Sequence, residues 1–296
     1  MRTLLFAACA AALAVSASAA PKDKAKAPSA APAKPAAPAT PAGPGAADWR
    51  TPDPNNVLVI DTNKGQIVVE MIPEAAPLHV AQIRALAHEN FYDGLKFFRV
   101  IDKFMDQTGD PQNNGQGGSS KPNIPAEFTF RRGSELPFVM AADQTVAEIG
   151  FIKSLPVESQ SMALGAITKD QKVTAWSLYC QGVMGMARDD NPDSGNSQFF
   201  VMRYPYPSLE KKYTAWGRVI SGQDVVRAIK VGEPVEQPQD YMEHVRVLAD
   251  LPEATRPKIR VVDTRGAWFK SEIERVRAAK GADFTACDVE IPVEVK

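Results

Sequence analysis

The sequence predicts a mainly β fold, and three features support that class. Residues 57–61 and 66–71 are apolar alternations joined by Asn63-Lys64-Gly65, the pattern of a β-hairpin with a glycine free to take a positive φ. Residues 97–101 alternate in the same way, and residues 213–219 have the composition of a further strand. The folded part of the chain, which begins near residue 56, is therefore expected to consist mostly of strands.

Three segments have the apolar spacing of helices instead. They are residues 74–88, 222–230 and 268–279. Apolar side chains share one face at Val80, Ile83 and Leu86 in the first segment, and at Phe269, Ile273 and Val276 in the third. Between and after these helices, residues 259–262 and 284–295 are expected to form strand.

The amino end has the pattern of a secretory signal peptide over residues 1–19. Met1-Arg2 supplies a short positive region, residues 4–15 are apolar, and Ala17-Ser18-Ala19 fits a cleavage signal. The apolar run is too short to span a bilayer. The sequence therefore predicts an exported protein without a transmembrane segment, located in the periplasm.

Residues 20–47 are almost wholly Pro, Ala and Lys. Such a composition cannot bury enough apolar surface to offset the entropy of ordering the chain, so a disordered linker is expected. The net charge of the 296-residue chain is −1, which argues against a nucleic-acid-binding protein. Its three histidines lack cysteines or carboxylates at ligand spacing, and neither a metal nor a cofactor is expected.

Residues 97–110, FFRVIDKFMDQTGD, contain the most informative anomaly in the chain. Arg99 shares a face of the predicted strand with Phe97 and Ile101, so its charge must either reach solvent or meet a ligand. Two further blocks follow in order, VMGMARDDNPDSGNSQFFVM over residues 183–202 and LEKKYTAWGRV over residues 209–219.

In order and spacing, these three blocks resemble the cyclophilins, the peptidyl-prolyl isomerase family, and with the signal peptide an exported bacterial member. The resemblance covers residues 56–250. It implies a closed eight-stranded antiparallel barrel capped by two helices. Residues 129–181 exceed what compact cyclophilins need and are expected to form an insertion with some secondary structure. Residues 251–296 are expected to be a carboxyl-terminal extension.

The resemblance assigns the catalytic role to Arg99, which would act on the prolyl nitrogen. An apolar cup for the proline ring would be formed by Phe104, Met105, Phe200 and Leu209. Gln107 would bond the substrate backbone, and Gln198 would support Arg99 or the substrate carbonyl. Arg188 and Tyr213 complete the predicted substrate-binding set, and the glycine-rich residues 110–121 would border the groove.

Some positions depart from the family pattern. Phe98 and Tyr213 stand where histidines are common, Arg188 replaces an asparagine whose backbone holds the peptide, and Thr108 replaces a glycine. Ser208 occupies the place of the tryptophan that contacts cyclosporin in eukaryotic members, so low affinity for that inhibitor is expected.

Two cysteines follow the predicted signal peptide, Cys180 and Cys287. An oxidising compartment would permit a disulfide between them, which would tie the extension to the end of the insertion. Separate burial as free thiols explains the two residues equally well.

Two functions from different classes remain open at this point. The first is a prolyl isomerase acting on unfolded or flexible proline-containing segments of exported or envelope proteins. The second is a non-catalytic chaperone or scaffold module that uses the same groove to bind proline peptides. Retention of Arg99 and Gln107 favours the enzyme, and a monomer is expected in either case.

Overall fold

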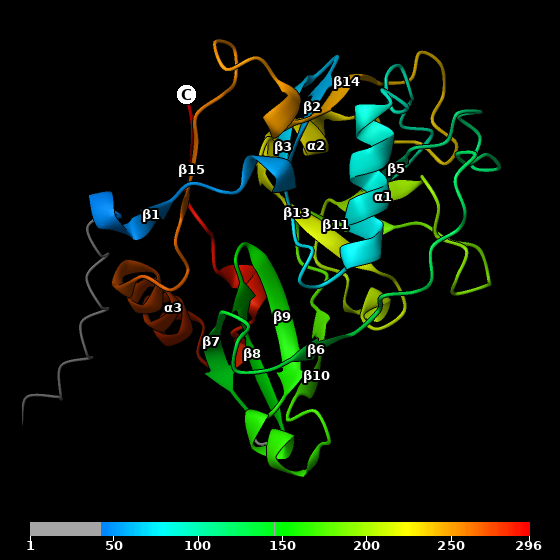
Figure 1. Ribbon diagram of the computed structural model, residues 1–296. Coiled ribbons are helices and arrows are strands. Elements are labelled where there is room, and N and C mark those ends of the chain that lie inside the picture. Colours follow the sequence, from blue (N-terminus) through cyan, green and yellow to red (C-terminus); the bar gives the residue numbers. More distant parts are fainter. Residues whose placement is uncertain (1–42, 145) are drawn as a thin grey trace, which may run out of the picture. The chain divides into compact units, whose positions relative to one another are not determined.

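The computed structural model describes residues 43–144 and 146–296, so the predicted signal peptide and most of the predicted linker lie outside the described residues. Its main sheet has eight antiparallel strands in the order β14-β2-β3-β13-β11-β12-β5-β4 (Figure 1). In that order the strands are Met242–Val247, Val57–Thr62, Gly65–Met71, Ala215–Ser221, Val183–Met186, Phe199–Met202, Met105–Thr108 and Arg99–Ile101. Helices α1 (Pro77–His88) and α2 (Gln223–Ala228) contribute Val80, Ile83 and Val226 to the core of this sheet.

The first two strands form the predicted hairpin. Thr62 pairs with Gly65 across the turn, and Gly65 has a φ of +134°, which an L side chain rarely adopts. The first helix begins at Pro77, three residues later than predicted, with proline at the helical position where a missing N–H costs least. The second helix is shorter than predicted because Gly222, at φ +89°, is its N-cap and Ile229 is already extended.

The prediction of a closed barrel is wrong. The two edge strands, β14 and β4, are not register partners, and the main sheet is an open, curled half-barrel. The edge of β4 is instead occupied by Gly232, since Val100 and Gly232 exchange N–H···O bonds of 2.8 Å in both directions. Residues 94–97 reach residues 240–242 by separate bonds, such as Phe97 N–H to Asp240 O at 2.9 Å. The segment before β14 thus lies where a closing ladder would have to form.

The predicted insertion contains a second antiparallel sheet, of five strands in the order β6-β10-β9-β8-β7. In that order they are Phe130–Arg132, Val173–Ser177, Leu155–Gln160, Ala147–Ile152 and Phe138–Asp143. One face of this sheet shares a hydrophobic cluster with the main sheet, in which Leu155 and Val157 meet Phe200 and Leu209. The insertion, which was expected to have some secondary structure, thus contains a regular sheet that packs on the main sheet.

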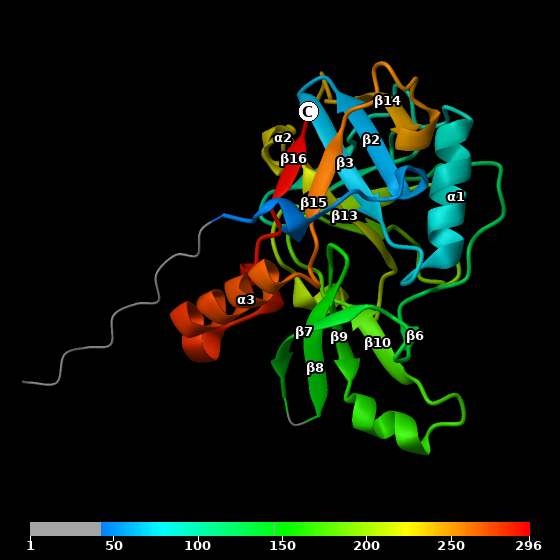
Figure 2. The ribbon, with the colours of Figure 1, turned by 60° about the vertical axis from the view of Figure 1, so that its left-hand side comes forward.

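The carboxyl-terminal residues form a three-stranded sheet and a helix. Strand β15 (Ile259–Val262) lies between β1 (Trp49–Arg50) and β16 (Val293–Val295), as Figure 2 shows. Helix α3 (Ala267–Lys280) buries Phe269, Ile273 and Val276, the face predicted from the sequence. Within the predicted strand 284–295, only the three residues of β16 pair with another strand, β15.

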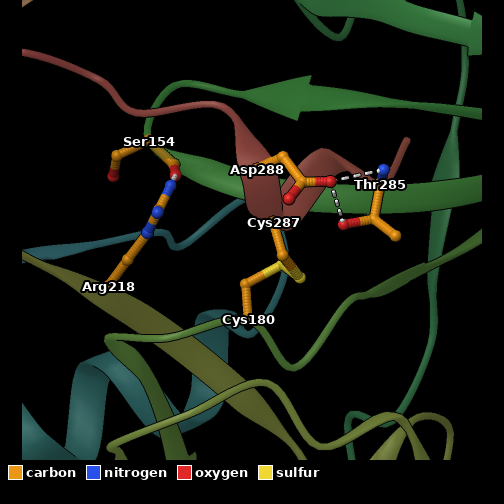
Figure 3. Close-up of a disulfide and its surroundings, with 6 residues drawn as sticks. All are labelled: Ser154, Cys180, Arg218, Thr285, Cys287 and Asp288. Carbon is orange, nitrogen blue, oxygen red and sulfur yellow. Dashed lines mark hydrogen bonds between the residues drawn. A yellow bond between two sulfur atoms is a disulfide. The ribbon is translucent and has the colours of Figure 1, made fainter. Parts of the chain in front are cut away.

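Cys180 and Cys287 form a disulfide in the structure, which decides between the two possibilities left open by the sequence (Figure 3). Cys180 is fully buried. Cys287 lies in a short turn fixed by Asp288, whose carboxylate accepts from the backbone N–H and the hydroxyl of Thr285. The bond therefore joins the end of the insertion to the extension.

We expect reduction of this disulfide to destabilise the protein. It closes a loop with a sequence separation of 107 residues, and native disulfides of this kind typically contribute about 2–5 kcal/mol to the free energy of unfolding. Thermal unfolding with and without reductant measures the effect. The double variant Cys180→Ser/Cys287→Ser is the control and should be insensitive to reductant. An unmodified protein whose melting temperature ignores reductant would contradict the expectation.

Candidate active site

The predicted site residues meet because of the register of four neighbouring strands. Arg99 on β4 is the partner of Gln107 on β5, Gln107 is the partner of Phe200 on β12, and Phe200 is the partner of Gly185 on β11. Directly opposite residues project to the same face of a sheet. Residues far apart in the sequence therefore form one continuous row.

Gly185 ends this row because the Phe200 ring occupies the space above it. A β-carbon at Gly185 would lie 2.2 Å from that ring, and backbone pairing leaves the strand little room to move. The missing side chain at Gly185 therefore lets Phe200 lie flat against β11. Phe200 is 5% exposed, and this small opening faces the groove described below.

A chain of hydrogen bonds holds the Arg99 guanidinium. Nη1 of Arg99 donates to Oε1 of Gln107 at 3.2 Å, and Nε2 of Gln107 donates to Oε1 of Gln198 at 3.0 Å. Nε2 of Gln198 donates in turn to the carbonyls of Gly115 (3.1 Å) and Gly117 (2.7 Å). In both Gln107 and Gln198 the side-chain oxygen accepts a hydrogen bond and the side-chain nitrogen donates one, so the orientations of the two amides are fixed.

The glycine-rich loop that ends this chain is organised by Asp110. Its carboxylate accepts from the backbone N–H groups of Gln112, Asn114 and Gly115 at 2.6–2.9 Å. Burial raises the pKa of the Asp110 carboxyl, but these N–H donors outweigh burial and leave the pKa below its usual value. The Asp110 carboxylate thus holds the loop whose carbonyls accept hydrogen bonds from Gln198.

A groove with a volume of about 760 Å³ opens over the row. Eight of the nine predicted site residues line it: Arg99, Phe104, Met105, Gln107, Arg188, Phe200, Leu209 and Tyr213. The ninth, Gln198, lines an adjoining hollow of about 560 Å³ that shares Gln107, Gly115 and Arg188 with the groove. The structure therefore brings the whole predicted set together.

The apolar end of the groove is built from aromatic contacts. The Phe200 ring meets Tyr213 edge-on at 5.8 Å between centroids, and from behind it stacks on Tyr179 at 6.1 Å. Met105 and Leu209 are 2% and 8% exposed, and with Phe104 they complete the apolar cup at this end of the groove. Tyr206 packs on Phe104 at 4.4 Å, whereas Ser208 is exposed and is not part of the lining.

Arg188 lines the groove beside Tyr213. Its guanidinium lies 4.6 Å from the centre of the Tyr213 ring and donates to the carbonyls of Lys212 (3.0 Å) and Asp189 (2.6 Å). These contacts hold the side chain against Tyr213.

Four groove residues were not predicted from the sequence. Phe98, Ala187, Glu233 and Pro234 also line it, and Glu233 accepts from Nε of Arg99 at 2.6 Å. Glu233 is 134 residues from Arg99, in a turn without a motif that marks a site, so only the folded structure could reveal this contact. Phe98 was noted as a departure from the family pattern, and the lining shows that its ring is part of the groove wall.

Behind the row lies a buried pair of a carboxyl group and a guanidinium. Nη1 of Arg203 donates to Oδ1 of Asp106 at 2.9 Å, and the same guanidinium donates to the carbonyls of Val226, Arg227 and Ile229 at the end of α2. Burial raises the pKa of Asp106 to about 7, a shift that Arg203 opposes and Asp240 reinforces. The pair connects β5 to α2 beneath the groove.

Within residues 43–144 and 146–296, no three His, Cys, Asp or Glu side chains lie close enough together to hold a metal ion. In the same ranges, no helix is both long and apolar enough to cross a bilayer.

The groove thus joins a guanidinium to an apolar lining on a curled antiparallel sheet. The chain belongs to the cyclophilin family: residues 57–249 match the family model for cyclophilin-type peptidyl-prolyl cis-trans isomerases. It is therefore an enzyme of that type.

Known proteins agree with this assignment. A probable peptidyl-prolyl cis-trans isomerase of Brucella suis is 35% identical over 195 residues, which cover 62% of this chain and 76% of the relative; the Brucella melitensis protein gives the same values. The crystal structure of the cyclophilin AquaCyp293 from Hirschia baltica superposes with a TM-score of 0.77 at 34% identity. That match covers 83% of this chain and 93% of the other, and so extends beyond the family domain.

We expect Asp106→Asn to change how stability depends on pH. The folded carboxyl keeps its proton up to about pH 7, whereas an unfolded aspartate loses it near pH 4, so this group stabilises the fold less as pH rises between those values. The stability difference, unmodified minus variant, should therefore fall with rising pH, by at most about 1.4 kcal/mol per pH unit.

Urea titrations between pH 4 and pH 8 measure that difference. Asp190→Asn, on an exposed turn, is the control for removal of a carboxylate elsewhere in the chain. A difference for Asp106→Asn that stays constant or rises with pH would contradict the expectation.

Proposed function

We propose that the groove accelerates X-Pro isomerisation through a hydrogen bond from Arg99 to the prolyl nitrogen. The barrier of about 18–20 kcal/mol exists because the C–N bond has partial double-bond character. A donor on the nitrogen localises its lone pair and so weakens that character. A guanidinium suits this role because it is charged at all working pH values and has five N–H donors.

The contacts of Arg99 support this role. Two of its donors are used, by Glu233 through Nε and by Gln107 through Nη1. The remaining three have no acceptor among the described residues and lie in a side chain that borders the groove. A fixed guanidinium with spare donors is preorganised to stabilise a change in charge at the substrate nitrogen.

The apolar cup supplies the second requirement, a fixed proline ring. Phe104, Met105, Phe200 and Leu209 line the apolar part of the groove, and burial of a proline ring against them is favoured by the hydrophobic effect. The residue before the proline can then rotate while the ring stays in place. No covalent bond is formed or broken, so the groove needs no nucleophile.

The substrates that we propose are flexible X-Pro segments of exported or envelope proteins. The signal-peptide pattern of residues 1–19 and the following Pro/Ala-rich segment support export to the periplasm. The Cys180–Cys287 disulfide is consistent with an oxidising compartment. The alternative of a non-catalytic scaffold is less favoured, because Arg99, Gln107 and the cup share one groove.

Arg99→Ala should lower kcat/KM about 100-fold or more, since it removes a donor used in the transition state. Its side chain is 38% exposed, so the loss of stability should stay below about 1 kcal/mol. A protease-coupled assay on a short Ala-Pro peptide, with thermal unfolding alongside, measures both. Arg131→Ala removes an exposed, ion-paired arginine of the insertion and is the control. Parental activity in Arg99→Ala would disprove the assigned role.

The export proposal has a separate test. When the full chain is produced in a Gram-negative bacterium, the protein should appear in the osmotic-shock fraction with its amino terminus at Ala20, as mass spectrometry can determine. Phe6→Arg, which interrupts the apolar run, should leave the uncleaved chain in the cytoplasm. An intact Met1 in the unmodified, correctly folded product would contradict export.

A further inference from the structure

Glu233 forms a short ion pair with Arg99, the proposed catalytic residue, although both side chains are exposed. Its Oε1 lies 2.6 Å from Nε of Arg99, although the Glu233 and Arg99 side chains are 55% and 38% exposed. Ion pairs as exposed as this contribute little to stability. Stability therefore does not account for this short ion pair at the rim of the groove.

The backbone around Glu233 is fastened to the strand that carries Arg99. Gly232 exchanges N–H···O bonds of 2.8 Å with Val100 in both directions, and Val235 N–H donates to Phe98 O at 3.0 Å. These three bonds join the turn to the residues on either side of Arg99, Phe98 and Val100. Glu233 is thus held opposite Arg99 by the backbone, whatever its side chain contributes.

The turn itself is rigid. A β-carbon at Gly232 would lie 2.7 Å from Cα of Val235, so the chain folds tightly back on itself there. Val235 is 4% exposed, and Nε2 of Gln239 donates to its carbonyl at 2.9 Å. Nζ of Lys230 donates to the carbonyl of Glu236 at 2.8 Å. The carboxylate is therefore presented from a fixed backbone and not from a freely moving loop.

The Glu233 carboxylate also changes the net charge of the groove. Among the described residues that line it, Arg99 and Arg188 are cationic and Glu233 is the sole anion. Arg188 is held on the Tyr213 side, so Glu233 sets the local charge beside Arg99. A peptide residue next to the bound proline would meet a paired guanidinium there instead of a free cation.

We infer that Glu233 is a positioning and specificity residue of the isomerase: it orients Arg99 together with Gln107, and it disfavours acidic residues before the proline relative to basic ones. This inference rests on the proposed role of Arg99. Two anchors at different nitrogens, Nε and Nη1, fix both the tilt and the rotation of the guanidinium plane. A single anchor would leave one of these free.

The test compares Glu233→Gln with the unmodified enzyme on three peptides, Ala-Xaa-Pro-Phe-p-nitroanilide with Xaa as Lys, Ala or Glu. The variant keeps the size of the side chain and removes its charge. We expect kcat/KM for the Ala peptide to fall about two- to fivefold, as suits the loss of one exposed charged anchor. The ratio of kcat/KM for the Glu peptide to that for the Lys peptide should rise about tenfold at low salt and less at high salt.

Glu236→Gln is the matched control. It removes the same charge from the same loop, three residues away, from an exposed side chain that does not line the groove. Its kcat/KM values and its Glu-to-Lys ratio should equal those of the unmodified enzyme. An equal rise of the ratio in both variants would overturn the inference, because the effect would then follow net charge alone.

Positioning has a readout of its own in the NMR spectrum. The Nε–H signal of Arg99, assigned by its loss in Arg99→Lys, should be sharp in the unmodified enzyme and should shift and exchange faster with water in Glu233→Gln. An unchanged Nε–H signal together with an unchanged peptide ratio would overturn the inference. If Arg99→Ala keeps parental activity, the proposed function fails instead, so the two failures are distinguishable.

Discussion

The register of β4, β5 and β12 is the constraint on which the active site depends. Side chains along a strand alternate between faces, so Met105 and Gln107 of β5 face the groove while Asp106 faces the interior. A slip of one residue would exchange these faces and place a carboxylate in the proline cup. The Asp106–Arg203 pair opposes such a slip, because Asp106 finds its guanidinium in the interior register. The buried Asp106–Arg203 pair thus fixes the register that places the Arg99 guanidinium at the groove.

The same alternation explains how far the sequence could predict the site. The residues of the cup and the row lie within short local patterns, such as FFRVI and SQFF, and a strand converts such patterns into a shared face without further information. All nine predicted residues accordingly meet at one groove and its adjoining hollow. Glu233 could not be found in this way, because its contact with Arg99 depends on the Gly232–Val100 pairing, which no local pattern encodes.

The fold shows the same division between local and distant information. The hairpin and the buried face of α3 follow from local periodicity and were predicted. The closed barrel that the resemblance implied was wrong, since closure depends on what lies between β14 and β4, and the chain places residues 232–240 there. The insertion was underestimated because its short strands mix polar and apolar residues, and the residues that cover its two faces are distant in the sequence. Leu155 clusters with Phe200 of the main sheet, and Phe151 packs against Phe269 of α3.

The disulfide has a consequence for how the protein can be dissected. Cys180 follows Tyr179, whose ring stacks behind Phe200, the floor of the proline cup. Cys287 and the inner face of the insertion belong to the same cluster as that floor. A fragment cut at residue 250, the edge of the family domain, would lose Cys287 and leave an unpaired thiol directly behind the cup. The carboxyl-terminal segment is therefore part of the wall that backs the active site, and a minimal cyclophilin domain excised from this chain would be a different enzyme from the whole.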